Sequence, residues 1–148
     1  MITESVQYAE ARLNDLAEIR RFVKNTSLKM GCANDAVSEI VLAANEAVTN
    51  ILIYGYDRKP GCIEIDMCLE GADLIVYLRD RSPSFDPNSF PPPDITLPLE
   101  LRKPGGMGIH MMRNFVDEMN YYEVADGVNE LALVKRDAVK TMKIETET

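Results

Sequence analysis

Proline is distributed very unevenly along this chain of 148 residues, and that distribution limits where regular structure can form. Seven of the eight prolines lie between Ser82 and Pro104, including the run Pro91-Pro92-Pro93. Because proline lacks an N–H donor and blocks helix continuation, this segment predicts a long loop. Long loops inside compact domains are often lids or binding loops, although others are disordered. We therefore expect a loop at about residues 82–104 with a block of helices and strands on either side.

The block before the loop begins with one short strand and two amphipathic helices. The alternating stretch Ser5 to Ala11 predicts an edge strand. Asn14 is the expected cap of the first helix and Gly31 its end, while Asn34 is the expected cap of the second helix. We expect the second helix to end before Gly55. Its apolar residues recur at a 3.6-residue period and predict one buried stripe: Val37, Ile40, Val41, Ala44, Val48, Ile51 and Leu52.

An antiparallel hairpin follows the second helix. Apolar residues alternate strictly from Cys62 to Leu69, which predicts a half-buried strand. Gly71 lies in a short turn that leads to a second strand, Leu74 to Leu78. Asp80 stands where this second strand ends.

The block after the loop contains a third helix and a second hairpin. The turn Gly105-Gly106-Met107-Gly108 opens the helix, and its predicted buried face comprises Ile109, Met112, Val116 and Met119. Two strands, Asn120 to Ala125 and Glu130 to Arg136, flank a turn at Asp126-Gly127. Residues after about 137 form a polar tail that we expect to be frayed.

This order of elements predicts a single α+β domain that spans residues 1–148. Strand pairs joined by short turns make a mostly antiparallel sheet, and three helices can cover one of its faces. The expected fold class is therefore a two-layer α/β sandwich. A chain of this length can bury a sufficient core without disulfides or a structural metal.

Charge and cysteine content exclude several classes of function. The net charge of −8 argues against direct nucleic-acid binding, because an acidic surface repels a phosphate backbone. Cys32, Cys62 and Cys68 form no CxxC pair, so we interpret them as free thiols. We find no signal-peptide pattern at the N-terminus and no apolar run that approaches the length of a membrane span. These features predict a cytoplasmic location.

Glu46 and Asn50 are four residues apart on the second helix, so their side chains share one helix face with Glu39 and Ala43. A carboxylate beside an amide oxygen can hold Mg²⁺ directly or through water. The carboxylate could also accept a proton from an attacking hydroxyl. The alternative interpretation is an ordinary solvated helix face.

Asp80 and the glycine-rich turn add two further candidate features. A carboxylate at the end of a strand could accept a hydrogen bond from the exocyclic amine of adenine, or it could simply form a turn. Gly105, Gly106 and Gly108 precede a helix, where backbone N–H groups and the helix dipole favour a phosphate. The alternative is a flexible entry to the helix.

Taken together, these segments resemble the ATP-binding domain shared by gyrase, heat-shock protein 90, histidine kinases and MutL, the GHKL superfamily. The segment from Glu39 to Asn50, which reads EIVLAANEAVTN, is similar to that superfamily's N box. The tripeptide Phe85-Asp86-Pro87 and the run GGMGIH are typical of its bacterial anti-sigma factor serine/threonine kinases. The resemblance covers nearly the whole chain and implies the Bergerat-type ATP-binding fold.

The resemblance also implies residue roles. Glu46 would act as the general base and Asn50 would ligate Mg²⁺. Asp80 would bind the adenine amine, with Asn129 reaching the same pocket from the last hairpin. Gly106, Met107 and Gly108 would lie under the phosphates of ATP or ADP. These assignments include both a nucleotide and a metal as cofactors, with the proline-rich loop as a lid.

The implied function is a kinase that phosphorylates an anti-anti-sigma partner of the STAS type and sequesters a sigma factor, as a homodimer.

One departure from the superfamily's pattern favours an alternative. The expected Asp-x-Gly-x-Gly reads Asp80-Arg81-Ser82-Pro83-Ser84, with serine at both glycine positions. Because serine has less access to positive φ, we expect either a turn rebuilt around Pro83 or a narrower pocket. A partner-switch module with weak or no nucleotide binding would then result. A histidine kinase catalytic domain acting in trans is a third possibility.

Overall fold

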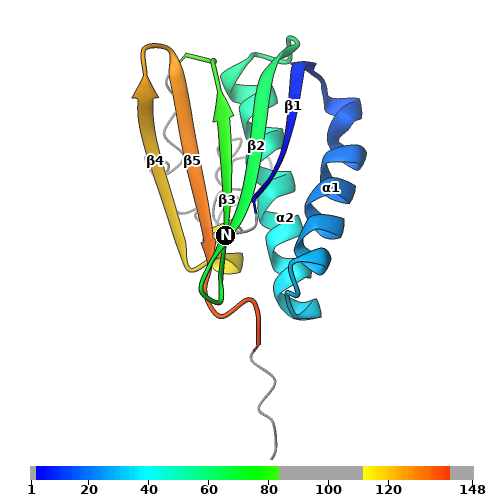
Figure 1. Cartoon of the computed structure of the whole chain (residues 1–148). Coiled ribbons are helices and arrows are strands. Elements are labelled where there is room, and N and C mark those ends of the chain that lie inside the picture. The colour runs from blue at the N-terminus through cyan, green and yellow to red at the C-terminus, as the bar shows by residue number, and fades with distance from the viewer. Residues whose placement is uncertain (1–2, 84–111, 141–148) are drawn as a thin grey trace, which may run out of the picture.

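Five β-strands form one antiparallel sheet in the order β1-β2-β3-β5-β4 (Figure 1). A computed structural model describes residues 3–83 and 112–140 of the chain. The strands are β1 (Thr3–Ala11), β2 (Gly61–Glu70), β3 (Asp73–Asp80), β4 (Glu118–Ala125) and β5 (Val128–Lys135). Their pairing confirms the N-terminal edge strand and both predicted hairpins.

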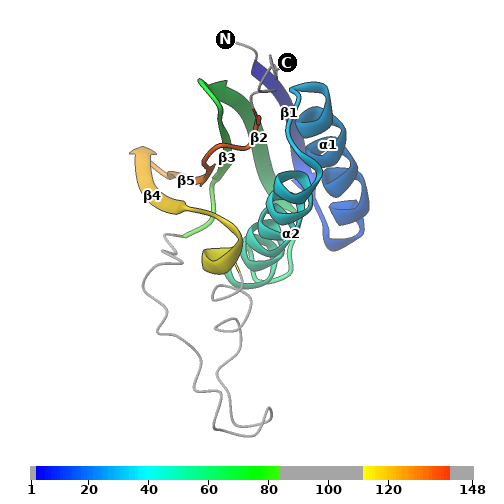
Figure 2. The same ribbon diagram turned by 90° about the horizontal axis from the view of Figure 1, so that it is seen from below.

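Two helices, α1 (Leu16–Lys29) and α2 (Asn34–Asn50), pack side by side on one face of the sheet (Figure 2). A 3-10 turn, η1 (Leu13–Asp15), leads into α1, and a π-helical turn, η2 (Ile51–Gly55), continues α2. Residues 112–115 are also helical and belong to the third predicted helix, whose beginning lies outside the described residues. The α+β two-layer sandwich is confirmed.

The hydrophobic core lies between the helices and the sheet. Both layers contribute fully buried side chains, among them Ile19, Ile40 and Leu52 from the helical layer and Ile63, Ile65, Leu78 and Leu133 from the sheet. Six of the seven residues in the predicted α2 stripe are buried, and only Val41 is partly exposed. Burial of this apolar stripe fixes the rotation of α2 about its axis, and so fixes which of its side chains can face a ligand.

The helical stretch Asn34–Gly55 is long and apolar enough to cross a membrane by length and composition alone. It reaches that length because η2 extends α2 to Gly55, close to the predicted end of the helix, although the sequence did not predict the π-helical form of this last turn. More than half of its most apolar part is buried inside the fold. Packing on the sheet therefore accounts for its composition.

Both predicted N-terminal caps are wrong. Asn14 lies inside η1, where the backbone N–H of Arg12 donates to Asp15 Oδ2 at 2.8 Å. Asn34 is the first residue of α2 and makes no capping hydrogen bond with its side chain. The neighbouring Asp35 carboxylate accepts a backbone N–H bond in the first turn instead. Aspartate at the second position satisfies a donor that Asn34 was expected to satisfy.

The end of α1 and the β4–β5 turn follow the prediction. Gly31 (φ 89°) follows the helix, and Gly127 (φ 74°) lies in the tight connection between the two strands. Both adopt the left-handed region, which glycine enters without a steric penalty.

The C-terminal part of the fold differs from the prediction in two ways. Met119 lies in β4 opposite Leu133, and not on the third helix, because that helix ends at residue 115. The chain also remains docked beyond Asp137. Ala138 is fully buried, and its carbonyl accepts a hydrogen bond from Ala33 N–H at 2.8 Å.

We predict that residues 138–140 contribute to stability. Deleting residues 138–148 removes the Ala33–Ala138 bond, the bond from Val139 N–H to the Ala72 carbonyl and the buried Ala138 methyl group. The free energy of unfolding should fall by about 2–4 kcal/mol in urea titrations. Deleting only residues 141–148 is the matched control and should leave it nearly unchanged. Equal stability of the two truncations would contradict this docking.

Candidate nucleotide-binding site

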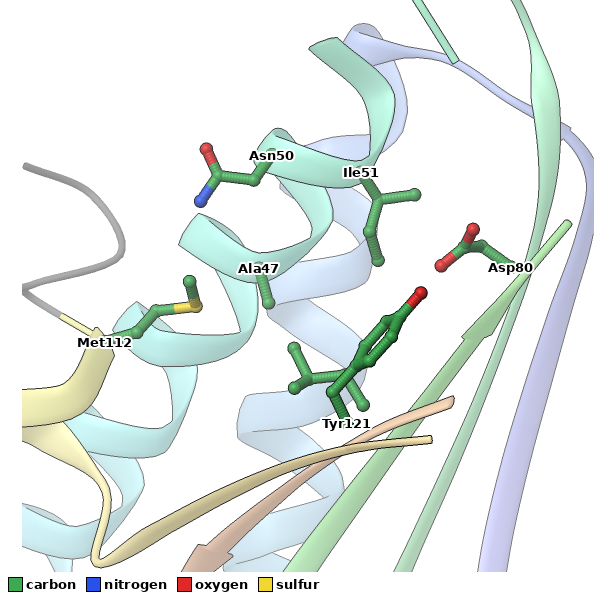
Figure 3. A pocket seen from close by; sticks show the side chains of 7 residues that line it. Ala47, Asn50, Ile51, Asp80, Met112 and Tyr121 are labelled. Carbon is green, nitrogen blue, oxygen red and sulfur yellow. The ribbon is translucent and has the colours of Figure 1, made fainter. Parts of the chain in front are cut away.

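A small pocket opens between the C-terminal end of α2 and the sheet (Figure 3). Its described lining comes from six elements and comprises Ala47, Asn50, Ile51, Asp80, Met112, Tyr121 and Leu131. The space that these side chains leave is about 10 Å³, close to the size that holds one water molecule. A nucleotide is larger than this space, so movement of a lining side chain would help to admit one. Met112 is suited to such movement, because its side chain is unbranched and flexible.

Asn50 occupies the last position of α2, where the backbone changes from α- to π-helical hydrogen bonding. Its side chain is buried, with 5% of its surface exposed. Among the described residues, Asn50 Nδ2 is the buried side-chain polar atom without a hydrogen-bond partner. A buried polar group without a partner costs about 1–3 kcal/mol, so its retention points to a ligand that satisfies it.

Glu46 lies one turn before Asn50 and is partly exposed. It makes no hydrogen bond or ion pair with the other described residues. Its neighbours differ from the solvated face that one interpretation of the sequence suggested, because Ala43 is fully buried and Glu39 is paired with Lys135 at 3.1 Å. Along α2, Glu46 therefore occupies a partly exposed position, and Asn50, one turn later, occupies a buried one.

Asp80 ends β3 and lies opposite Asn129 of β5 in the sheet register. Its carboxylate oxygen Oδ1 accepts three hydrogen bonds: from the Ser82 N–H at 2.9 Å, from the Ser82 hydroxyl at 2.5 Å and from Asn129 Nδ2 at 3.1 Å. Asp80 is buried and lines the pocket together with Asn50 (Figure 3). The structure therefore brings Asn50 and Asp80 to one cavity from opposite layers of the sandwich.

Ser82 does not create the backbone strain that its place in a glycine-rich motif suggested. Among the described non-glycine residues, only Asp57, Arg58 and Asp137 have positive φ, so Ser82 has an ordinary backbone conformation. The space for its side chain comes from Gly55 of η2. A Cβ atom at Gly55 would lie 2.6 Å from Ser82 Oγ and 3.0 Å from Ser82 Cβ. Glycine is therefore needed at residue 55, across the contact from the serine.

Tyr56 holds the end of β3 against the start of β2. Its hydroxyl donates to the Cys62 carbonyl at 2.6 Å and accepts the Arg81 N–H at 2.7 Å. Burial raises the pKa of the Tyr56 phenol, so the hydroxyl stays protonated as a donor at neutral pH. The ring also packs against Gly61, where a Cβ atom would lie 2.4 Å from it. Tyr56 therefore fixes the backbone that follows Asp80.

The described residues fit a magnesium ion that is held mainly by a ligand. No group of three or more His, Cys, Asp or Glu side chains able to hold a metal occurs within residues 3–83 and 112–140. Mg²⁺ commonly keeps several waters and takes one or two protein ligands together with substrate phosphates. The amide oxygen of Asn50 could serve as a single protein ligand of that kind, while its unpaired amide nitrogen suits an acceptor such as a phosphate oxygen.

The structure does not place every predicted residue in this pocket. Asn129 is 1% exposed and lies behind Asp80, outside the pocket lining. Gly106, Met107 and Gly108 lie outside the described residues, and so does most of the proposed lid. The sequence missed Tyr121 and Tyr56 as site residues. Tyr121 faces inward opposite Leu131, and only the strand register, which no sequence motif encodes, brings it to the pocket.

The histidine kinase-like ATPase domain family matches residues 9–135. The chain belongs to this family. That match includes both layers of the sandwich and the whole of α2, the helix that carries Glu46 and Asn50. The resemblance to the anti-sigma kinase branch is confirmed by the individual relatives.

Two curated relatives cover most of this chain. The anti-sigma F factor of Anoxybacillus flavithermus is 33% identical over 103 residues, which are 68% of this chain and 70% of the relative. The serine-protein kinase RsbW of Bacillus cereus is 30% identical over 113 residues, which are 74% of this chain and 71% of the relative. A crystal structure of the RsbU and RsbW domains of a Mycobacterium tuberculosis protein superposes with a TM-score of 0.64 at 19% identity. It matches 92% of this chain, which spans only 32% of that longer chain, and it shows the fold.

We predict that Gly55 and Ser82 are energetically coupled. Gly55→Ala should lower the free energy of unfolding by about 1–3 kcal/mol, because the new methyl group overlaps the Ser82 side chain. Adding Ser82→Gly should restore most of that loss, since it removes both contacting atoms. A double-mutant cycle measured by urea unfolding gives the coupling energy. Additive effects of the two substitutions would contradict the contact.

Proposed function

We propose that this protein binds ATP with Mg²⁺ and transfers the terminal phosphoryl group to a serine of a small protein partner. The observation that supports this most strongly is the pairing of two incomplete polar groups at one pocket. Asn50 offers a buried amide with an unpaired nitrogen, and Asp80 offers a carboxylate whose Oδ2 makes no hydrogen bond with the described residues. An adenine amine facing Asp80 would satisfy the carboxylate, and a phosphate oxygen could accept a hydrogen bond from the Asn50 amide nitrogen while the Asn50 amide oxygen faces the cation.

The order of the residues along α2 supports the direction in which the nucleotide lies. Asn50 lies at the pocket, and Glu46 lies one turn away toward the exposed part of the helix. We place the base near Asp80, the metal at Asn50 and the transferred phosphoryl group near Glu46. Gly106, Met107 and Gly108 would then supply backbone N–H groups to the phosphates, as the resemblance implies.

The chemistry requires little covalent participation by the protein. The serine hydroxyl of the partner attacks the terminal phosphorus, the bond to the bridging oxygen breaks, and ADP leaves. Glu46 accepts the hydroxyl proton during this step. Bound Mg²⁺ would neutralise charge on the phosphate oxygens. The products are ADP and phosphoserine on the partner.

The names of the relatives support a proposal for the partners. One relative is an anti-sigma F factor and another is a serine-protein kinase, so we propose that this protein combines both properties. It would phosphorylate an anti-anti-sigma protein of the STAS type and sequester a sigma factor in the cytoplasm. We further propose that it acts as a homodimer. The acidic net charge of −8 agrees with a regulator that does not contact nucleic acid directly.

We predict that Asp80→Asn weakens ATP binding by about tenfold to a hundredfold. The change replaces an acceptor by an amide and removes a charge-assisted hydrogen bond of about 1.5–3 kcal/mol. Calorimetric titration with ATP and ADP in the presence of Mg²⁺ measures it. Asp126→Asn, in the exposed β4–β5 turn, is the control and should bind like the parent protein. Unchanged affinity in Asp80→Asn would place the base elsewhere.

We predict that Glu46→Gln keeps ATP affinity within about threefold but lowers phosphoserine formation by about 10²–10⁴, the usual contribution of a general base. Radiolabelled ATP and the cognate anti-anti-sigma protein give the rate, and calorimetry gives the affinity. Glu10→Gln, at an exposed position of β1, is the control. Phosphorylation at the parental rate in Glu46→Gln would remove Glu46 from this role.

Two observations favour a second candidate, a partner-switch module that binds nucleotide weakly or not at all. The Ser82 hydroxyl already engages Asp80 at 2.5 Å, and the cavity beside it is only about 10 Å³. Under this alternative, partner binding alone would transmit the signal. Titration of the unmodified protein distinguishes the two, because saturable ATP binding that Asp80→Asn weakens excludes the module without nucleotide.

A further inference from the structure

Four side chains form one continuous hydrogen-bond relay beside the pocket. The Tyr121 hydroxyl donates to Asn129 Oδ1 at 2.9 Å, and Asn129 Nδ2 donates both to Asp80 Oδ1 at 3.1 Å and to the Ser82 carbonyl at 2.9 Å. The Ser82 hydroxyl closes the relay by donating to the same Asp80 oxygen at 2.5 Å. Asp80, Ser82 and Asn129 are all buried, so this relay is protected from competing water.

The relay divides the Asp80 carboxylate into two unequal oxygens. Oδ1 receives three donors, which occupy its lone pairs. Oδ2 receives none from the described residues. Because the donors come from Ser82 and from Asn129 of the neighbouring strand, they resist rotation of the carboxylate about its Cβ–Cγ bond. One oxygen is thereby held as an anchor and the other is left for a ligand.

Asn129 has no hydrogen-bond donor left for direct contact with a base. Both protons of its amide are used, by Asp80 and by Ser82, and its oxygen accepts from Tyr121. Its side chain is also 1% exposed and does not line the pocket. The assignment of Asn129 as a nucleotide-binding residue therefore changes to a residue that acts through Asp80.

We propose that Ser82, Asn129 and Tyr121 are positioning residues that fix Asp80 with only Oδ2 presented to the pocket, and so set selectivity for a base with an N–H donor at that point. This inference rests on the proposed nucleotide binding. A carboxylate is an acceptor only, so it favours an exocyclic amine and disfavours a carbonyl oxygen in the same place. A carboxylate free to rotate would discriminate less, because it could withdraw from the carbonyl or admit a bridging water.

Base selectivity provides the test. We expect the parent protein to bind ATP at least about tenfold more tightly than inosine triphosphate, in which a carbonyl replaces the amine. Ser82→Ala, Asn129→Ala and Tyr121→Phe should each reduce this ratio, the first two by about tenfold, which corresponds to one hydrogen bond to a charged group. Tyr121→Phe should have the smallest effect, because it removes only the outermost bond of the relay.

Three controls separate positioning from loss of structure. Tyr122→Phe changes the adjacent, outward-facing tyrosine of β4 and should leave the ratio unchanged. Asp80→Ala should abolish selectivity, and adding Asn129→Ala to it should have no further effect on the ratio. Thermal unfolding identifies any variant that fails to fold, and Tyr121→Phe, which deletes a single oxygen atom, remains informative if Asn129→Ala does not fold.

The ligand-free protein supplies a readout that does not depend on nucleotide. The side-chain amide protons of Asn129 should exchange slowly with solvent in nuclear magnetic resonance spectra, and Asp80→Ala should accelerate that exchange. Fast exchange in the parent protein, or equal affinity for ATP and inosine triphosphate, would overturn the inference. Slow exchange of the Asn129 amide protons in a protein that binds no ATP would instead support the relay and contradict the proposed nucleotide binding.

Discussion

The register between β3 and β5 is the constraint on which the candidate site depends. It places Asp80, the last residue of β3, opposite Asn129, near the start of β5, with the two side chains on the same face of the sheet. Because side chains alternate between faces, a slip of one residue would move Asn129 to the outer face and remove its bonds to Asp80 and Ser82. Inward burial of Leu78, Leu131 and Leu133 in the same strands opposes that slip. Packing of these apolar side chains thus fixes the strand register on which the hydrogen bonds of Asn129 depend.

The helical layer constrains the other half of the pocket. The buried stripe of α2 sets the rotation of the helix, and the π-helical turn at Ile51–Gly55 then changes the path of the chain beside Asn50. The Tyr56 N–H bonds to the Ile51 carbonyl at 2.8 Å, five residues back. Such π-turns are frequent at functional sites, since they redirect side chains that a regular helix would place elsewhere. Here the turn brings Ile51 to the pocket and Gly55 against Ser82.

The sequence predicted the fold well because periodicity reports burial directly. The α2 stripe and the alternation of β2 each describe one apolar face, and both faces are found in the core. The same pattern could not show that Ala43 and Asn50 are buried on the other side of α2. Met112 lines the same pocket as Ala47 and Asn50, although it lies far from them in the chain (Figure 3). Tertiary contacts of this kind leave no local period in the sequence.

Ser82 shows why a motif letter alone is insufficient to predict a site. Serine in place of glycine suggested either a rebuilt turn or a narrower pocket, because glycine is often required for its backbone freedom. At this position the backbone is ordinary, and the effect of the substitution lies in the side chain. Its hydroxyl supplies Asp80 with an additional donor, and Gly55 supplies the space for it. Serine at position 82 looks like the loss of a motif glycine. It is accommodated by Gly55, which lies 27 positions earlier in the chain (82 minus 55), and Asp80 remains available as the acceptor that a nucleotide base would need.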